Sequence, residues 1–162
     1  MQSTFEDLAR AAEDHYLQPT EMNSFKQQVD ALQDRLTVYE AIRDHELVIF
    51  QTIADQLHKE PASNSPSDIE KVLTHWIAVL RYSAMAMLMD QPEVLTDQLG
   101  WLTDVVSGDE YLSLHQHISE LLHQCLHSVL AEDQIMLIEP FLQPVDAALF
   151  SEDSNRELVV LG

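Results

Sequence analysis

Apolar residues recur at steps of three and four along most of the chain, which is the spacing of a buried helix face. The most regular stripe consists of Met22, Phe25, Val29, Leu32 and Leu36, and it reads as a buried seam. Glycine is nearly absent, and no β-branched run bounded by turn residues marks a hairpin of strands. The sequence therefore predicts an all-α fold.

Capping residues and prolines divide this pattern into separate helices. Two capping boxes are expected, Ser3 with Glu6 and Ser67 with Glu70, and Asp44 is expected to cap a helix of its own. The predicted segments are 4–16, a helix from Pro19 through Leu36, one from Asp44 to before Pro61, one from Ser67 to Met89, one from Asp90 toward a C-cap at Gly108, one around 114–129, and one over 132–150.

The segment 67–89 is apolar on much of its circumference, which is typical of a central helix. In the last segment, Pro140 and Pro144 are expected to kink or divide the helix, because proline cannot donate a backbone hydrogen bond. Residues 151–162 are interpreted as a polar tail that ends in a short apolar hook, 158–161.

Length and composition indicate one compact domain. A chain of 162 residues, 46% of them hydrophobic, can bury roughly two thirds of its unfolded surface. A single cysteine excludes an intrachain disulfide, which suits a reducing compartment. The first residues lack the features of a signal peptide, and Arg81 and Asp90 interrupt the longest apolar runs, so no secretion signal and no integral membrane segment are expected.

The chain is strongly acidic. It has 28 acidic and 8 basic residues and a formal charge of -20, which would repel phosphate backbones. Nucleic acid is therefore not an expected partner. The charge is explained either by solubility alone or by complementarity to a basic protein.

Several short blocks resemble the phycobiliprotein family. Ala12–Pro19 (Ala-Glu-Asp-His-Tyr-Leu-Gln-Pro) is similar to the family's turn between its first two helices, and Ala54–Leu57 (Ala-Asp-Gln-Leu) to its Gly-Asp-Gln-Leu. Leu80-Arg81, Asp90–Leu102 and Val145–Leu149 also fall on family segments, in order, so the resemblance covers about residues 5–150. It implies a globin-like phycobiliprotein fold with an N-terminal helical hairpin (1–33), a globin-like core (34–150) and a C-terminal tail (151–162).

The resemblance departs from the family at the pigment site. Family members attach an open-chain bilin through the cysteine of a Cys-x-Arg-Asp motif, and the corresponding positions here are Val72, Thr74 and His75. A thioether cannot form at valine, and loss of the aspartate removes a charge-assisted hydrogen bond of about 1.5–3 kcal/mol. These three residues are interpreted as a vestigial bilin site, and no cofactor is expected.

A second departure concerns pairing between subunits. The resemblance implies contact through the N-terminal hairpin, with an aspartate there bonded to the arginine of Leu-Arg. Arg81 is present, but the hairpin position is Ala11, with Glu13 or Asp14 as neighbouring substitutes. The predicted partner-binding residues are Phe5, Leu8, Tyr16, Met22, Phe25 and Arg81; the alternative for the apolar ones is internal packing.

Other chemistry has weaker signals. Glu120, His123 and His127 have a spacing that suits a divalent metal on a helix face, but the favoured interpretation is that these side chains are solvated, and no metal site is expected. Cys125 lies on an apolar stripe and is interpreted as a small buried hydrophobe. His75 is either a satisfied histidine or a ligand for a non-covalent tetrapyrrole.

The side chains around the lost pigment position also have two interpretations. They either fill the space that a chromophore occupies in the family or belong to an ordinary core. Filling is the favoured interpretation. These side chains are Trp76, Tyr82, Met85, Met87 and Met89.

The functional hypothesis is a non-catalytic, phycobiliprotein-like protein without covalent bilin. It would bind other proteins in the assembly or regulation of the phycobilisome or a photosystem of cyanobacteria. Expected partners are phycobilisome or photosystem proteins, among them basic linker-like polypeptides, or a second copy in a homodimer. The expected location is the cytoplasm or the periphery of the thylakoid membrane. The alternative is a protein that binds bilin or haem non-covalently for pigment delivery or light sensing.

Overall fold

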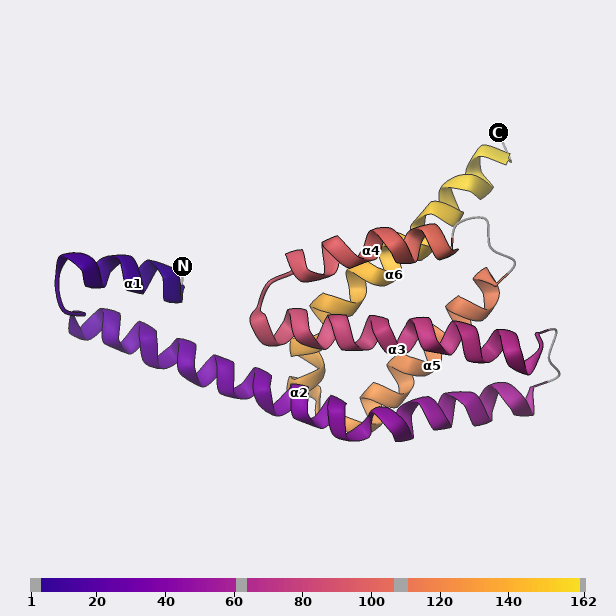
Figure 1. Ribbon diagram of the computed structural model, residues 1–162, viewed down its shortest axis with the longest axis horizontal. Coiled ribbons are helices and arrows are strands. Elements are labelled where there is room, and N and C mark those ends of the chain that lie inside the picture. The colour runs from indigo at the N-terminus through magenta and orange to yellow at the C-terminus, as the bar shows by residue number, and fades with distance from the viewer. Residues whose placement is uncertain (1–3, 61–63, 107–110, 161–162) are drawn as a thin grey trace. The chain divides into compact units, whose positions relative to one another are not determined.

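The computed structural model describes residues 4–60, 64–106 and 111–160, of which 105–106 and 151–160 are described by their backbone alone. Helices make up nearly all of this part of the chain, and it contains no strand, so the all-α prediction is confirmed. Figure 1 labels the helices. They are α1 (Phe5–Asp14), α2 (Pro19–Lys59), α3 (Pro66–Met89), α4 (Glu93–Val106), α5 (Leu112–Val129) and α6 (Glu132–Val160).

The chain divides into two compact units, an N-terminal unit of residues 1–37 and a core unit of residues 38–162. Helix α2 belongs to both, and the predicted boundary after residue 33 lies within it. The prediction that a new helix begins at Asp44 is wrong. No glycine or proline interrupts residues 20–60, and the Asp44 carboxylate accepts a hydrogen bond from Arg43 instead of capping a helix.

In the N-terminal unit, α1 folds back along the first turns of α2 (Figure 1). The capping box lies one residue later than predicted, because Thr4 and Asp7 exchange hydrogen bonds between side chain and backbone; Ser3 lies outside the described residues. Leu8 is buried, and the rings of Phe5 and Phe25 meet edge to face with centroids 5.5 Å apart. These contacts hold the two helices together.

In the core unit, α3 is the central helix that the sequence predicted. It packs against α4, α5 and α6, and ten of its residues are buried. The predicted cap at Ser67 is wrong, because Ser65 caps the helix and Pro66 follows at its first position, where a missing N–H costs nothing. At the other end, Asp90 adopts a left-handed conformation (φ 53°) that ends the helix.

The deepest polar contact of the core joins α3 to α5. The indole Nε1 of Trp76 donates a hydrogen bond of 3.0 Å to Nδ1 of His115, and both side chains are fully buried. Since Nδ1 accepts this bond, the neutral imidazole carries its proton on Nε2. The contact orients two large side chains within an otherwise apolar cluster.

Helix α6 contains Pro140 and Pro144 without being divided by them, and its backbone stays helical to Val160, beyond the expected start of the tail at residue 151. The prolines are four residues apart, so the N–H groups that they lack belong to one side of the helix. In an uninterrupted helix the carbonyl of Met136 would accept a hydrogen bond from the N–H of residue 140. The side chain of Met136 is exposed, so this side of α6 faces water. The remaining hydrogen-bond ladder is enough to continue the helix.

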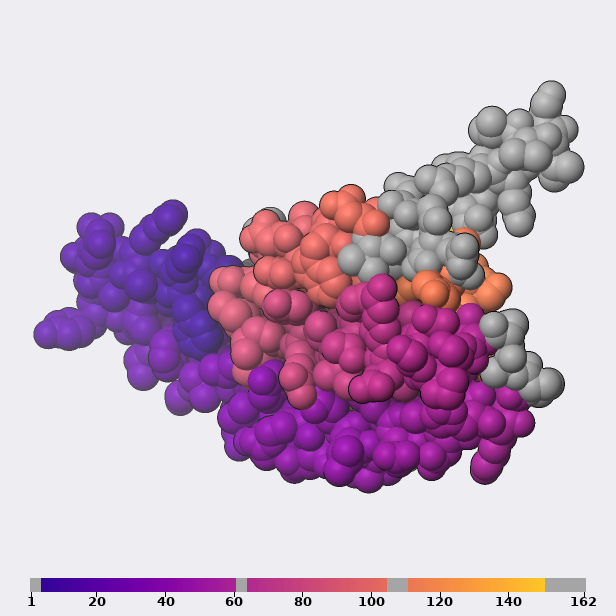
Figure 2. Space-filling view, turned by 45° about the vertical axis from the view of Figure 1, so that its right-hand side comes forward, coloured from indigo at the N-terminus to yellow at the C-terminus, as the bar shows by residue number. Residues whose placement is uncertain are grey.

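Helix α3 is the only helix of the described chain whose length and apolar composition would allow it to cross a membrane. Half of its most apolar stretch is buried within the core unit, as expected for the central helix of a folded core. Figure 2 shows α3 beside α2 and α4 on one face of this unit. The described residues therefore contain no clear integral membrane segment.

We predict that Trp76→Phe lowers the free energy of unfolding by about 1–3 kcal/mol, because it leaves a buried imidazole acceptor unpaired and opens a small cavity. Urea denaturation followed by circular dichroism measures the change. Tyr82→Phe, at a partly exposed position of the same helix, serves as the control and should change stability by less than about 0.5 kcal/mol. Equal effects of the two substitutions would contradict the assigned role of the Trp76–His115 contact.

Candidate functional site

The N-terminal unit exposes an apolar surface, which we call the hairpin face. Its side chains retain 39–47% of their exposure, although a large apolar side chain of a helical hairpin would normally be covered. The prediction of a buried seam along α2 is therefore wrong for this part of the helix. The hairpin face consists of Phe5, Met22, Phe25, Val29, Leu32 and Leu36.

The lengths of the two helices explain this exposure. Helix α1 has 10 residues and is about 15 Å long, whereas the 19 residues of α2 in the same unit extend about 28 Å. One short helix cannot cover the longer one, so Val29, Leu32 and Leu36 stay open toward its far end. The apolar spacing identified these residues, but nothing local in the sequence reports that α1 is too short to bury them.

The predicted partner-binding residues of the hairpin fall into three groups. Phe5, Met22 and Phe25 lie on the hairpin face. Leu8 is only 4% exposed and belongs to the interior of the hairpin, so its prediction as a surface residue is wrong. Tyr16 lies in the connection between α1 and α2 and is almost fully exposed.

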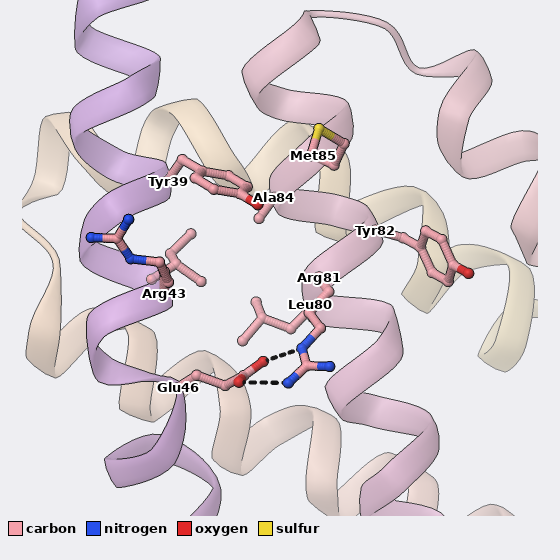
Figure 3. Close-up of a pocket in the computed structure, with 9 residues that line it drawn as sticks. Tyr39, Arg43, Glu46, Leu80, Arg81, Tyr82, Ala84 and Met85 are labelled. Carbon is pink, nitrogen blue, oxygen red and sulfur yellow. Dashed lines mark hydrogen bonds and ion pairs between the residues drawn. The ribbon is translucent and has the colours of Figure 1, made fainter.

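Arg81 forms an ion pair within the core unit that the sequence did not reveal. Its Nε and Nη2 donate hydrogen bonds of 2.7 and 2.9 Å to the two carboxylate oxygens of Glu46 on α2 (Figure 3). These hydrogen bonds, and then the carboxylate charge, raise the pKa of Arg81. The partners are 35 residues apart, a separation that helical spacing cannot connect.

This ion pair closes one end of a pocket between α2 and α3. The pocket has a volume of about 390 Å³ and a mainly apolar lining. Ile42, Leu80 and Ala84 line it, and Tyr39 reaches from α2 toward Ala84 and Met85 of α3 (Figure 3).

The three residues of the vestigial bilin site do not form a common pocket. Val72 is buried in the core, whereas Thr74 is exposed and its hydroxyl donates to the carbonyl of Glu70. His75 is half-buried, with its ring edge against Trp101 of α4 at 5.8 Å between centroids. Sequence spacing could not pair Trp101 with His75, because the two lie on different helices.

Side chains pack closely around one small hollow beside Trp101. A hollow lined by Val79, Leu99 and Trp101 measures about 10 Å³, which is close to the size of one water molecule. Trp76 and Met87 are buried, as the hypothesis that these side chains fill the pigment space requires. Met85, Met89 and Tyr82 are 36–48% exposed and do not fill the interior. The hypothesis is therefore wrong for these three side chains.

Histidines of α5 connect this helix to other parts of the core unit. Nε2 of His123 lies 2.8 Å from Oδ2 of Asp146 on α6, and Nδ1 lies 3.8 Å from Glu139. His117 lies 2.9 Å from Glu60, next to the end of α2. The interpretation of His123 as a solvated side chain is therefore wrong.

The predicted metal ligands are not brought together. The carboxylate of Glu120 lies 4.0 Å from His117, and His123 binds Asp146 and Glu139 instead. No group of three or more candidate ligands lies close together in the described part of the chain, so the metal hypothesis is not supported.

Two further arrangements resemble catalytic groups without having their geometry. Ser119 donates to Oδ1 of Asp146 at 2.7 Å, but His123 bonds to the other oxygen of the same carboxylate, so no base activates the hydroxyl. Cys125 is partly buried against the core, and burial raises the pKa of its thiol, which disfavours a nucleophilic thiolate.

The chain matches no protein-family model, and no curated protein is significantly similar to it. The phycobiliprotein relation therefore stays a prediction from the short sequence blocks.

The His123–Asp146 contact predicts a pH-dependent stability. The hydrogen bond to Asp146 and the nearby carboxylate charges raise the pKa of His123 above its ordinary value of 6.5, against the effect of burial. The contact should stabilise the fold fully below about pH 6.5, and its contribution should be lost as the pH rises through the higher value of the folded state.

Urea denaturation between pH 6 and pH 9 measures this contribution. His123→Gln should lower the free energy of unfolding by about 1–2 kcal/mol at pH 6 and have a smaller effect at pH 9. His127→Gln, at an exposed position of the same helix, is the matched control. A loss of the same size at both pH values would show that the contact does not depend on the imidazolium charge.

Proposed function

We propose that this chain is a pigment-free, non-catalytic relative of phycobiliprotein subunits that binds another protein through its N-terminal unit. The observation that carries the proposal is the hairpin face, an apolar surface along the stripe from Met22 to Leu36 that α1 leaves exposed within the N-terminal unit. An exposed apolar surface of this kind is typical of a protein interaction site. The assembly or regulation of the phycobilisome or of a photosystem is the proposed setting.

The region around the vestigial site supports a role without pigment. Val72 is buried in the core and cannot form a thioether, and the hollow beside Trp101 is far smaller than a ligand pocket of about 300–1,000 Å³. A tetrapyrrole would have to displace packed side chains there. These observations favour protein binding over the alternative of non-covalent bilin or haem binding.

The charge of the N-terminal unit indicates the kind of partner. Residues 1–37 contain seven acidic and three basic residues, which surround the apolar stripe with excess negative charge. A partner with an apolar helix face and a basic rim fits this surface, since the apolar face supplies affinity and the opposite charge speeds association. We therefore propose a basic, linker-like polypeptide as the partner, at the periphery of the phycobilisome or thylakoid membrane.

We expect Phe25→Ala and Leu32→Ala each to weaken partner binding by about tenfold, because each removes an apolar contact from the centre of the proposed interface. The measurement is a pull-down from a phycobilisome-containing lysate at low and high salt, with the captured polypeptides identified. Met136→Ala, which truncates an exposed methionine of α6, is the matched control. Unchanged capture by both hairpin variants would refute the proposed surface.

Arg81→Ala provides a separate test of the ion pair. The Arg81 side chain is 68% exposed, so removing it should change stability little. A loss of partner binding without a loss of stability would then indicate that Arg81 contacts the partner. If binding is unchanged, Arg81 does not belong to the interface.

The pigment-free assignment predicts a colourless protein. When it is produced with bilin or haem supplied, the protein peak from gel filtration should have no visible absorbance, because the space beside Trp101 holds no more than a water-sized group. A visible band that co-elutes with the protein would favour the alternative function.

A further inference from the structure

The pocket between α2 and α3 has the size and lining of a small-molecule site. Its volume of about 390 Å³ falls within the usual range for ligand pockets, about 300–1,000 Å³. At about 30 Å³ for a water-sized group, it has room for roughly a dozen non-hydrogen atoms. Its apolar lining favours an aliphatic or aromatic body.

One end of this pocket is polar. Arg81 lies at this end, and its two hydrogen bonds to Glu46 use two of the five N–H donors of the guanidinium. The side chain is 68% exposed, so the rest of the guanidinium is open to a second acceptor. A carboxylate suits this position, because a charge-assisted hydrogen bond to arginine is stronger than a neutral one.

Two arginines line this pocket together with Tyr39. Each arginine has a carboxylate partner, Asp44 at 2.9 Å from Arg43 and Glu46 at 2.7 Å from Arg81. A bound anion would therefore depend on the N–H donors that the hydrogen bonds to Glu46 leave open on Arg81, and not on a net positive charge of the opening.

We propose that the α2–α3 pocket binds a small amphipathic carboxylate, with its apolar body between Tyr39 and Met85 and its carboxylate on the open side of Arg81. The site shares Arg81 with the proposed function and otherwise goes beyond it, since it needs neither the hairpin face nor a protein partner. Glu46 holds the guanidinium in place and also competes with the ligand for it.

Isothermal titration calorimetry with decanoate, decanol and decyltrimethylammonium tests the ligand chemistry on the full chain. Decanoate should bind with a dissociation constant of about 10 μM to 1 mM, at least tenfold more tightly than the other two. Equal binding of decanoate and decanol would overturn the role assigned to Arg81. No detectable decanoate binding at 1 mM would overturn the site.

Substitutions in the pocket separate its two parts. Glu46→Gln removes the competing carboxylate and should tighten decanoate binding about threefold to tenfold. The double substitution Glu46→Gln with Arg81→Gln should bind decanoate at least tenfold more weakly than the unsubstituted protein does. Its binding of decanol should stay within about twofold. Met85→Trp, at a partly exposed position, should fill the pocket and reduce binding of both. Met136→Trp is the matched control, with circular dichroism to check folding.

These experiments also separate the pocket from the proposed function. Phe25→Ala and Leu32→Ala should leave decanoate binding unchanged, because both residues lie in the N-terminal unit. Loss of decanoate binding in Met85→Trp with unchanged partner capture supports two separate sites. If both Met85→Trp and the double substitution Glu46→Gln with Arg81→Gln leave decanoate binding unchanged, the proposed pocket is overturned, whatever the result of the pull-down.

Discussion

The core unit depends on the need to cover α3 on most sides. Because the helix is apolar around much of its circumference, a single neighbour cannot bury it, and α4, α5 and α6 pack against it. Burial of this surface supplies the main driving force, and the Trp76–His115 hydrogen bond gives the packed side chains one definite arrangement. Val72, one of the three vestigial bilin positions, is buried by the same packing.

Much of the fold could be predicted from local patterns. The helical class, the central position of α3 and the approximate extent of most helices follow from apolar spacing and from proline and capping residues. The errors occurred where a local signal had a stronger competitor. Asp44 resembles an N-cap, but the flanking helical pattern continues through it, and Ser67 resembles one although Pro66 already begins the helix. Pro140 and Pro144 were expected to kink or divide the helix, but they do not divide it, because the groups that they leave unpaired lie on one side of α6.

The candidate sites were less predictable because they depend on contacts between distant segments. Spacing along a helix identified Phe25, and the resemblance to phycobiliproteins identified Arg81. Neither could show that α1 is too short to cover α2 or that Glu46 binds Arg81. Similarly, three residues at metal-ligand spacing suggested a site on α5, whereas His123 finds its partners on α6. No pattern in the sequence predicted the α2–α3 pocket, since the residues that line it are an ordinary mixture of core and surface residues. Only the relative placement of helices determines such features.

The histidine bridges of α5 have a consequence for behaviour in solution. With only 8 lysines and arginines in the chain, histidines act as additional cations that are present only when protonated. Mild acidification would strengthen the bridge from His123 to Asp146 and would also reduce the negative charge that keeps molecules apart. The stabilisation from this bridge is complete below about pH 6.5, whereas the negative charge continues to fall toward the isoelectric point near 4.4 that the composition gives. Below about pH 6.5, further acidification therefore favours association between molecules without strengthening this bridge.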